Sequence, residues 1–452
     1  MNLPERFNAF VRSGNLLADE HPTLLAVSGG VDSLVMAHLF RQADHAFGIA
    51  HCNFGLRGAD SDADEFFVRQ LAGSWGVPFF ATGFETTTYA EQNGLSIQMA
   101  ARELRYAWFR KIAAENDYLR IATAHNLNDS VETALLNFTR GTGLSGLTGI
   151  AASSFPAGDV IGLIRPILFA GRSEIEEYAR DQNLAWREDS SNAGDEYTRN
   201  FLRHRIIPLL EELNPDFLHT AGRNLNRLRE TDENLHFLLQ NYFGENATPG
   251  EGFYIDKQKL VQLPAPRRAL RELLKIYGFT EEQCRQVAEG LHYTGLEIHS
   301  GSGWRLLNDR EKILLATQSP IPNPQSLTIS ILPDDLMVTL PARGRLLLIY
   351  SDVASAFPDG RAAVLVDAEK LQFPLLLRPW QAGDHFQPFG LNGHSQKLQD
   401  FFTNLKLSRF EKEKVLVLEN GDGAILWVVG YRLDERFRVT SATHKFLKIS
   451  YL

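Results

Sequence analysis

The stretch from Leu24 to Phe40 constrains the fold more than any other part of this sequence. It begins with four apolar residues, Leu24 to Val27, a run typical of a buried strand in a parallel sheet. Small residues interrupt the run at 28–33, and apolar residues return at helical spacing from Leu34. A strand, a glycine turn and a helix start aim backbone N–H groups at one point, so the stretch predicts an α/β unit with a phosphate-binding turn.

The residues of this turn supply the donors that a phosphate group needs. Gly29 and Gly30 allow close backbone approach and positive φ, while Ser28 and Ser33 add hydroxyl groups. The turn is not a Walker P-loop, because that motif ends in Lys and the first lysine of the chain is Lys111. It also lacks the third spaced glycine of the dinucleotide-binding fingerprint. The alternative to a phosphate site is a plain glycine turn between a strand and a helix.

Further strands and helices alternate along the first part of the chain. Strands are predicted at 46–50, 77–81 and 118–124, and helices at 61–73 and 96–116. This alternation predicts a parallel sheet, in which ligands bind beyond the carboxyl ends of the strands. The polar residues expected at those ends, beside the glycine turn, are His51, Asn53, His125 and Asp129.

The pattern changes twice in the rest of the chain. Near Asn214 it becomes helix after helix, through about Thr294, which predicts a helical domain. A proline-rich segment at 318–325 reads as a linker, and short alternating stretches beyond it predict a small α+β domain. The predicted domains are 1–213, 214–317 and 318–452.

Net charge, cysteine content and the lengths of apolar runs exclude some classes of protein. A net charge of −9 argues against nucleic-acid binding through overall charge but allows local basic patches. Cys52 and Cys284 lie far apart, so neither a disulfide framework nor a thiolate metal cluster is supported. No apolar run reaches the roughly 18 residues of a membrane span, and the N-terminus has no apolar signal region. These features predict a cytoplasmic protein without a membrane partner.

Several motifs carry a family resemblance. The turn Ser-Gly-Gly-Val-Asp-Ser resembles the PP-loop of the N-type ATP pyrophosphatases, which cleave ATP to AMP and pyrophosphate. Four further stretches occur in the order seen in tRNA(Ile)-lysidine synthetases: HCNFGLRGADSDADEFFV, AARELRYAWF, TAHNLNDSVETALLNFTRG and EDSSNAGDEYTRNFLRHRIIPLL. LRPWQAGDHFQPFGLNGHSQKLQDFF is similar to the C-terminal substrate-binding domain of that family. The matches cover most of residues 24–210 and about 375–440, while the helical middle resembles the family only in general character.

The resemblance implies an ATP-dependent ligase. It would attach L-lysine to C2 of the wobble cytidine, position 34, of tRNA(Ile) with a CAU anticodon, giving lysidine and changing the codon read from AUG to AUA. ATP would first adenylylate the C2 oxygen and release pyrophosphate, and the lysine ε-amine would then displace AMP. AMP is a better leaving group than an amide-like oxygen, and such chemistry needs charge neutralisation by Mg²⁺ and fixed donors. The resemblance also suggests a homodimer.

On this resemblance the turn binds the ATP phosphates and the second strand end lies on the nucleotide side. Arg105 is expected at the α-phosphate, with Arg102 either assisting or paired with neighbouring acids. His125 is expected to donate to a phosphate or to carry a proton, although a lone histidine is often structural. The residues assigned to ATP are Ser28, Gly29, Gly30, Val31, Asp32, Ser33, His51 and Asn53.

Three carboxylates are candidates for the lysine and metal sites. Asp129 and Glu132 lie three residues apart on one helix face, so both can point into the same cleft. Such a pair suits a cationic amino acid or Mg²⁺, and one carboxylate can take the proton from the ε-amine. Asp32 cannot approach a phosphate without repulsion, so it is expected to hold Mg²⁺ or the lysine ammonium group. Asp32 and Asp129 are the predicted metal ligands; the alternative is that they serve as helix N-terminal acids.

Basic residues near 200 form the best RNA candidate, because phosphate contacts need cations. They show no neighbouring acid in the sequence, and the alternative is a basic helix face at a domain junction. A mild basic excess in the C-terminal region, interleaved with aromatics, is also expected to contact tRNA. The RNA candidates are Arg199, Asn200, Arg203 and Arg205, with Arg57 earlier in the chain.

Two other functions remain open at this point. The first is another PP-loop enzyme such as a tRNA thiolation enzyme, which generally uses paired cysteines or an iron–sulfur site that Cys52 and Cys284 do not provide. The second is a non-catalytic tRNA-binding protein, which would predict erosion of the turn or of the Asp129/Glu132 pair. Both features are intact in this sequence.

Overall fold

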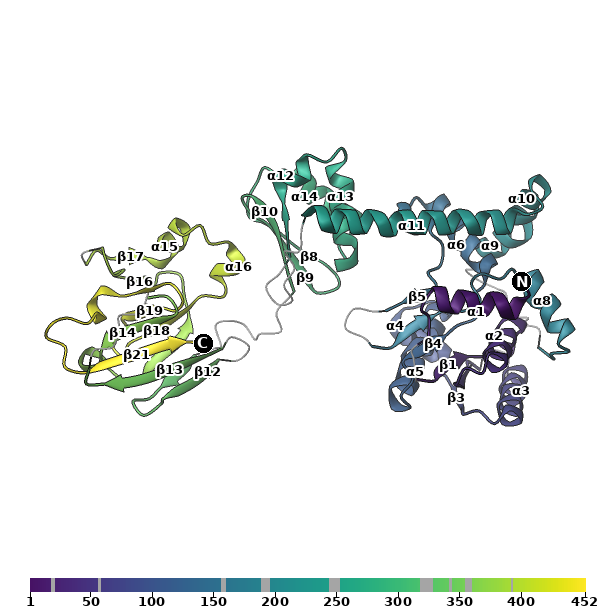
Figure 1. The fold of residues 1–452 in the computed structure, drawn as a ribbon, viewed down its shortest axis with the longest axis horizontal. Coiled ribbons are helices and arrows are strands. Elements are labelled where there is room, and N and C mark those ends of the chain that lie inside the picture. The colour runs from purple at the N-terminus through teal and green to yellow at the C-terminus, as the bar shows by residue number, and fades with distance from the viewer. Residues whose placement is uncertain are drawn as a thin grey trace. The chain divides into compact units, whose positions relative to one another are not determined.

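The computed structural model describes residues 1–17, 21–55, 58–155, 160–187, 196–243, 253–317, 328–340, 344–353, 360–391 and 393–452. The chain divides into two compact units, Met1–Leu235 and His236–Leu452 (Figure 1). The domain boundaries expected at 213 and 317 stay predictions, and the proline-rich segment lies outside the described residues.

A six-stranded sheet forms the centre of the first unit. Its strand order is β3-β2-β1-β4-β6-β5, and every neighbouring pair is parallel except β5 with β6. The strands are β1 (Thr23–Ala26), β2 (Phe47–Asn53), β3 (Phe79–Gly83), β4 (Arg120–Ala122), β5 (Ser153–Ser154) and β6 (Gly162–Ile164). The parallel α/β domain expected from the sequence is therefore confirmed, and β5 and β6 are additions that the sequence reading missed.

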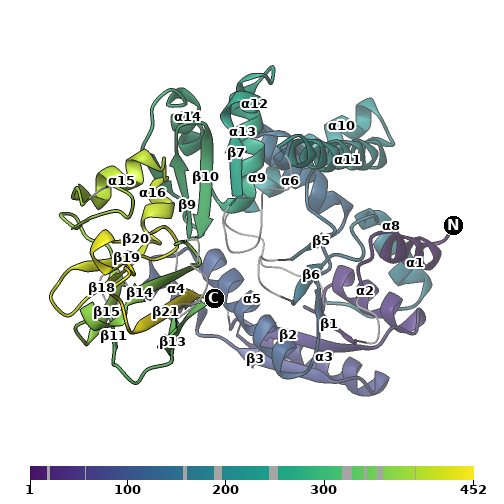
Figure 2. The same cartoon turned by 60° about the vertical axis from the view of Figure 1, so that its left-hand side comes forward.

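Helices cover both faces of this sheet (Figures 1 and 2). Successive residues of a strand point to opposite faces, and both Leu24 and Leu25 are fully buried. Leu25 packs in a cluster with one set of helices, and Leu24 packs against the opposite helix. The first set is α1 (Leu3–Ser13), α2 (Val31–Gln42), α3 (Ala59–Trp75) and α8 (Arg172–Asp181), and the opposite helix is α5 (Ile97–Glu115). Short α4 (Thr86–Asn93) precedes α5.

A second helical group completes the first unit. Leu127 and Val131 of α6 are buried against Ile207 and Leu225. This contact joins α6 to helices that follow it by more than 60 residues. The group contains α6 (Leu127–Arg140), α7 (Leu144–Leu147), α9 (Glu196–Phe201), a π-helical turn (Leu202–Ile206), α10 (Ile207–Leu213) and the first part of α11 (Phe217–Phe243).

The beginning of the second unit contains a sheet where the sequence pattern predicted helices alone. The antiparallel order is β7-β10-β9-β8, and three short helices accompany it: α12 (Lys257–Val261), α13 (Pro266–Leu274) and α14 (Glu281–Glu289). The expectation of a purely helical domain over 214–317 is therefore wrong. The Gly-Ser-Gly run at 301–303 is a hairpin signal that the helical reading passed over. The strands are β7 (Phe253–Asp256), β8 (Leu296–His299), β9 (Trp304–Asn308) and β10 (Lys312–Thr317).

The rest of the second unit is a small α+β region, as expected. Two antiparallel sheets, β11-β15-β18-β19-β20 and β12-β13-β21-β14, pack around a core that includes the fully buried Trp427. Four of the strands lie where the sequence alternation predicted them: β13 (Gly344–Ser351), β14 (Ala363–Asp367), β18 (Leu416–Glu419) and β19 (Ile425–Val428). The others are β11 (Ile329–Ile331), β12 (Met337–Leu340), β15 (Leu375–Pro379), β20 (Arg432–Leu433) and β21 (Phe446–Tyr451), beside the pair β16 (His385–Phe386) and β17 (Gln396–Lys397) and helices α15 (Leu398–Asn404) and α16 (Arg409–Lys412).

Within the described parts of the chain, the helices are too short or too polar to cross a lipid bilayer.

Candidate active site

The glycine turn joins β1 directly to α2. Gly29 has φ of +100°, a backbone conformation that side chains other than glycine rarely adopt, and Gly30 is the N-cap of α2. The Ser33 hydroxyl donates to the Gly30 carbonyl at 2.9 Å and accepts from the Ser28 amide at 3.2 Å. The N–H groups of the first helical turn have no acceptor within the helix, and they face the space beyond β1. This arrangement can bind an anion at a helix N-terminus.

Two residues that the sequence reading did not select hold the turn in place. The Arg187 amide donates to the Gly29 carbonyl at 3.1 Å. The guanidinium of the same residue forms an ion pair with Asp64 of α3, a carboxylate that is 7% exposed. The turn is thus fixed from outside by a residue far along the chain, and no local pattern could have identified it.

Asp32 lies in the first turn of α2 and points toward the start of α6. Its Oδ1 accepts a hydrogen bond of 3.1 Å from Asn126 Nδ2, and its Oδ2 pairs with Arg172. Burial raises the pKa of Asp32, the charge of Asp129 raises it further, and Arg172 opposes the shift. Asp32 and Asp129 are therefore close enough to repel one another, and Arg172 is a partner that the sequence analysis missed.

The start of α6 brings the two other candidate carboxylates together. Asn126 caps the helix, its Oδ1 accepting from the Asp129 amide at 3.2 Å while Asp129 Oδ2 accepts from the Asn126 amide at 3.1 Å. Glu132 lies on the same side, and its side chain is only 1% exposed. Burial raises the pKa of Glu132. The helix cap therefore fixes Asp129 while the helix spacing places Glu132 beside it.

Arg203 closes this carboxylate pair. Its Nε donates to Glu132 Oε1 at 2.7 Å, and its NH2 lies 3.0 Å from Glu132 Oε2 and 3.3 Å from Asp129 Oδ1. Arg203 has no neighbouring acid in the sequence, but the fold supplies two. The acids lie on α6, 71 residues earlier for Glu132, and the π-helical turn carries Arg203 onto them. Arg199 is exposed and close enough to lower the pKa of Glu132, Arg205 is exposed, and Asn200 is half-buried.

His125 lies between the carboxylates and a group of arginines. Its Nδ1 is 2.9 Å from the Thr123 hydroxyl. Burial lowers the pKa of His125 to about 4, the nearby Asp129 opposes this, and Arg165, Arg102 and Arg105 lower it further. The imidazole is therefore neutral at pH 7. A neutral ring can donate one hydrogen bond to a phosphate but carries no charge to neutralise it.

The three arginines near His125 form what we call the arginine cluster: Arg102, Arg105 and Arg165. Arg102 lies over the Tyr106 ring at 5.0 Å and Arg105 over the Phe54 ring at 5.0 Å. Among the described residues, no carboxylate forms an ion pair with any member of this cluster. The alternative that Arg102 is paired with neighbouring acids is not supported there, and the sequence analysis did not select Arg165.

His51 and Asn53 are placed at the end of β2, next to the turn. His51 Nδ1 bonds to the Val27 carbonyl at 2.9 Å, so this side chain ties β2 to the start of the turn. Asn53 Nδ2 donates to Asp62 at 2.9 Å, and its Oδ1 accepts from the Gly55 amide at 3.0 Å. Both side chains are buried and bonded within the protein. We therefore expect ATP to contact the backbone or neighbouring atoms here, and not these two side chains. Arg57, another candidate from this stretch, lies outside the described residues.

The donor set at the carboxylates fits Mg²⁺. The oxygens of Asp32 and Asp129 are the hard ligands that this ion prefers. Burial raises the pKa of Asp32, and the charge of Asp129 raises it further against the opposing charge of Arg172, so the two carboxylates repel one another. A cation would relieve that repulsion.

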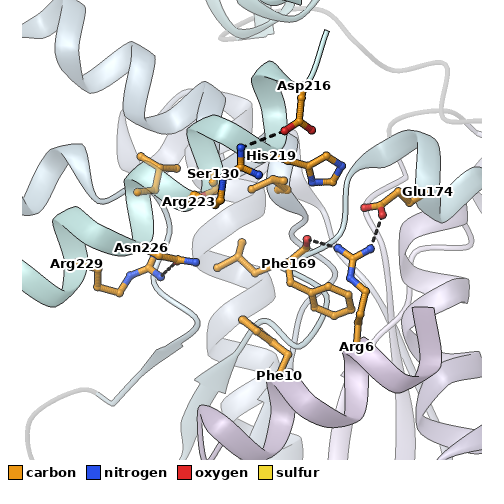
Figure 3. A pocket seen from close by; sticks show the side chains of 14 residues that line it. Arg6, Phe10, Ser130, Phe169, Glu174, Asp216, His219, Arg223, Asn226 and Arg229 are labelled. Atoms are coloured by element: carbon orange, nitrogen blue, oxygen red, sulfur yellow. Dashed lines mark hydrogen bonds and ion pairs between the residues drawn. The ribbon is translucent and has the colours of Figure 1, made fainter. Parts of the chain in front are cut away.

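A separate cavity of about 520 Å³ lies in the first unit (Figure 3). Arg6 bonds to Glu174 and to the Phe169 carbonyl on one side of it, and Arg223 pairs with Asp216 at 3.1 Å on the other. Leu127 and Ser130 of α6 line it, but none of the residues predicted for the site does. Arg6 and Arg223 on its two sides are each paired with a carboxylate, so neither is free to bind an anion in this cavity.

Comparison with known proteins covers nearly the whole chain. Residues 2–210 match the PP-loop domain, residues 248–320 the TilS substrate binding domain and residues 375–449 the TilS substrate C-terminal domain. The tRNA(Ile)-lysidine synthase of Parabacteroides distasonis is 36% identical over 98% of this chain and 98% of its own length. Proteins of the same name from Bacteroides thetaiotaomicron and Porphyromonas gingivalis are 36% and 34% identical over 98% and 100% of this chain, and over 99% of their own lengths.

Proposed function

The chain belongs to the tRNA(Ile)-lysidine synthase family, and from that premise we propose how the residues at its sheet edge carry out the ligation. The supporting observation is that the turn after β1, the carboxylates of α6 and the arginine cluster converge at the carboxyl ends of neighbouring strands. The substrates are ATP, L-lysine and tRNA(Ile) with a CAU anticodon. We infer that the reaction takes place in the cytoplasm, where these substrates occur.

The first step is adenylylation of the wobble cytidine. The amides of the turn at 28–33 and the first-turn N–H groups of α2 bind the pyrophosphate part of ATP. Arg105 contacts the α-phosphate, and neutral His125 donates a hydrogen bond to the same group. The C2 oxygen of cytidine attacks the α-phosphorus, an O–P bond forms, and the bond to pyrophosphate breaks. His51 and Asn53 shape the nucleotide side of the turn through the bonds that they make within the protein.

The second step joins lysine to the activated base. The ε-amine must lose a proton to attack C2, and Asp129 accepts it, because the cap holds this carboxylate beside Asp32 and Glu132. Glu132 and Asp32 hold the positive charge of lysine nearby. The amine attacks C2, the C–O bond to AMP breaks, and AMP leaves with its electron pair. Arg203 balances the two α6 carboxylates until a cationic substrate enters.

Mg²⁺ is the metal that we propose for this site, held by Asp32 and Asp129. When bound, it would neutralise charge on the ATP phosphates. The RNA is held by Arg199, Asn200 and Arg205, together with Arg203 when substrate displaces it from Glu132. We also propose, on the family resemblance, that the protein acts as a homodimer.

The test is incubation of the full chain with ATP, Mg²⁺, labelled lysine and unmodified tRNA(Ile) with a CAU anticodon. We expect pyrophosphate release that requires the tRNA, followed by entry of label into RNA. Formation of ADP in place of AMP and pyrophosphate would overturn the proposal. Sulfur incorporation would indicate a thiolation enzyme, and tRNA binding without ATP turnover would indicate a non-catalytic protein.

A further inference from the structure

Arg165 is a buried arginine at the carboxyl end of β6. It is 9% exposed, and its NH1 donates to the Ala151 carbonyl at 2.7 Å. Its buried Nε has no hydrogen-bond partner among the described residues. One nitrogen of the guanidinium is therefore anchored to the backbone, and the group retains N–H donors that can bind a ligand.

The surroundings of Arg165 add positive charge. Burial lowers the pKa of Arg165, Tyr106 opposes the shift, and Arg102 lowers the pKa further. Within the described ranges no carboxylate forms an ion pair with Arg165. A buried charge without a counter-ion is costly, and a second like charge raises that cost. An anion bound between Arg165 and Arg102 would remove both penalties.

The position of Arg165 identifies the source of that anion. The Thr123 amide donates to the Ile164 carbonyl at 2.9 Å, so the ends of β4 and β6 meet just before His125 and Arg165. β6 lies beyond β4 on the side of β1 that is opposite to β2. With ATP placed from the β2 end across the turn and lysine at the carboxylates of α6, the space over β4 and β6 is left for the third reactant. That reactant is an RNA nucleotide, whose phosphates are anions.

We propose that Arg165, with Arg102, binds an RNA backbone phosphate next to the cytidine that reacts. This rests on the proposed function, since it assigns the β6 side of the site to the tRNA substrate. A guanidinium fork suits a phosphate because two parallel N–H donors can reach two of its oxygens. By fixing the backbone of the wobble nucleotide, Arg165 would orient the base toward the α-phosphorus of ATP.

Arg120 provides a matched control. It is the first residue of the neighbouring strand β4, so it lies at the opposite end of the strands from Arg165. Its NH1 donates to the Leu119 carbonyl at 2.9 Å, and its buried Nε also has no hydrogen-bond partner among the described residues. Its guanidinium lies over the Phe155 ring at 4.8 Å, so an aromatic face stabilises its charge instead of an anion. Arg120→Gln and Arg165→Gln remove similar backbone anchors from the same sheet.

The experiment measures the affinity of the full chain for unmodified tRNA(Ile) at increasing KCl concentration. We expect Arg165→Gln to weaken binding on the order of tenfold at low salt and to reduce the log–log salt slope by about 0.7 to 0.9, the value for one phosphate contact. Arg120→Gln should match the wild type, and the KM for ATP should be unchanged in both variants. Arg165→Lys, which keeps the charge, should keep the wild-type slope.

Three results would overturn this assignment. The first is an unchanged slope in Arg165→Gln. The second is an increase in the KM for ATP of Arg165→Gln without a change in slope, which would indicate that the guanidinium binds an ATP phosphate. The third is a slope loss in Arg165→Lys as large as that in Arg165→Gln, which would point to lost packing. If the wild type binds tRNA with a normal slope but transfers no lysine, the proposed function fails while the slopes still decide the role of Arg165.

Discussion

Arginines in the two units of this protein meet different electrostatic surroundings. In the first unit the arginine cluster has no carboxylate partner among the described residues. In the C-terminal part of the second unit several arginines are paired at short range, among them Arg378 with Asp384 at 2.9 Å and Arg436 with Asp434 at 2.9 Å. Arg409 and Arg438 are also paired, with Glu297 at 3.1 Å and Glu435 at 2.9 Å.

This difference shows that a count of basic residues does not identify an RNA surface. An arginine that is already paired must break that pair to bind a phosphate, whereas an unpaired one gains a partner. Arg203 is an intermediate case, because it balances the α6 carboxylates in the free protein. We therefore expect the chemistry to depend on the carboxylates and Arg105, the RNA affinity on Arg165 and Arg102, and neither on the paired C-terminal arginines.

The largest effect should follow Asp129→Asn. The variant keeps an acceptor for the Asn126 amide but cannot take a proton, so we expect lysine transfer to fall about 1,000-fold, or roughly 4 kcal/mol in the barrier. The measurement is the rate of labelled lysine entering tRNA. The salt slope of tRNA binding should not change. A transfer rate within threefold of the wild type would remove Asp129 from the chemistry.

Next in size is Arg203→Met, which leaves the buried Glu132 without its partner. We expect the free energy of unfolding to fall by about 3 kcal/mol, because breaking a buried pair exposes the cost of the remaining charge. Urea unfolding of the full chain measures this. Arg205→Met is the control, since Arg205 is exposed on the same π-helical turn and no carboxylate within the described ranges pairs with it. Equal losses in the two variants would contradict the importance of the Glu132 contact.

The neutral state of His125 predicts a pH effect of moderate size. Its pKa is about 4 in the folded protein against 6.5 for an unperturbed histidine, so the unfolded chain binds more protons between these values. Stability from this residue is fully present above about pH 7 and is lost as the pH falls through that window. Between pH 7 and pH 5 the wild type should lose about 2 kcal/mol more than His125→Gln. If the free energies of unfolding of the wild type and His125→Gln, measured in urea, change with pH in parallel, the pKa shift of His125 is absent.

The smallest effect should follow Arg409→Gln. The side chain is 62% exposed and pairs with Glu297 and Glu413 at 3.1 and 3.5 Å. Exposed pairs contribute little, so the free energy of unfolding should change by less than about 1 kcal/mol. The salt slope of tRNA binding should stay at the wild-type value. A slope reduced by about one would place this paired arginine on the RNA and break the contrast between the two units.

Much of the first unit could be predicted because its signals are local. The strand, turn and helix of residues 24–40 and the helix spacing of Asp129 and Glu132 depend on neighbours within one or two turns of chain. The sheet of residues 253–317 escaped prediction, because its strands are only four to six residues long and β7 pairs with β10 more than 50 residues later. Short apolar runs of this kind do not distinguish strand from helix.

The sequence by itself determined the strand, glycine turn and helix at 24–40, the helix spacing of Asp129 and Glu132, and the family to which these motifs point. The tertiary structure alone decided which charges are balanced: Arg203 meets Glu132 across 71 residues, Arg172 meets Asp32 across 140, and Arg165 meets no acid among the described residues. The physical reason is the distance along the chain over which each property is determined. Backbone conformation follows from adjacent residues, whereas the state of a charge depends on whatever the fold brings within a few ångströms of it.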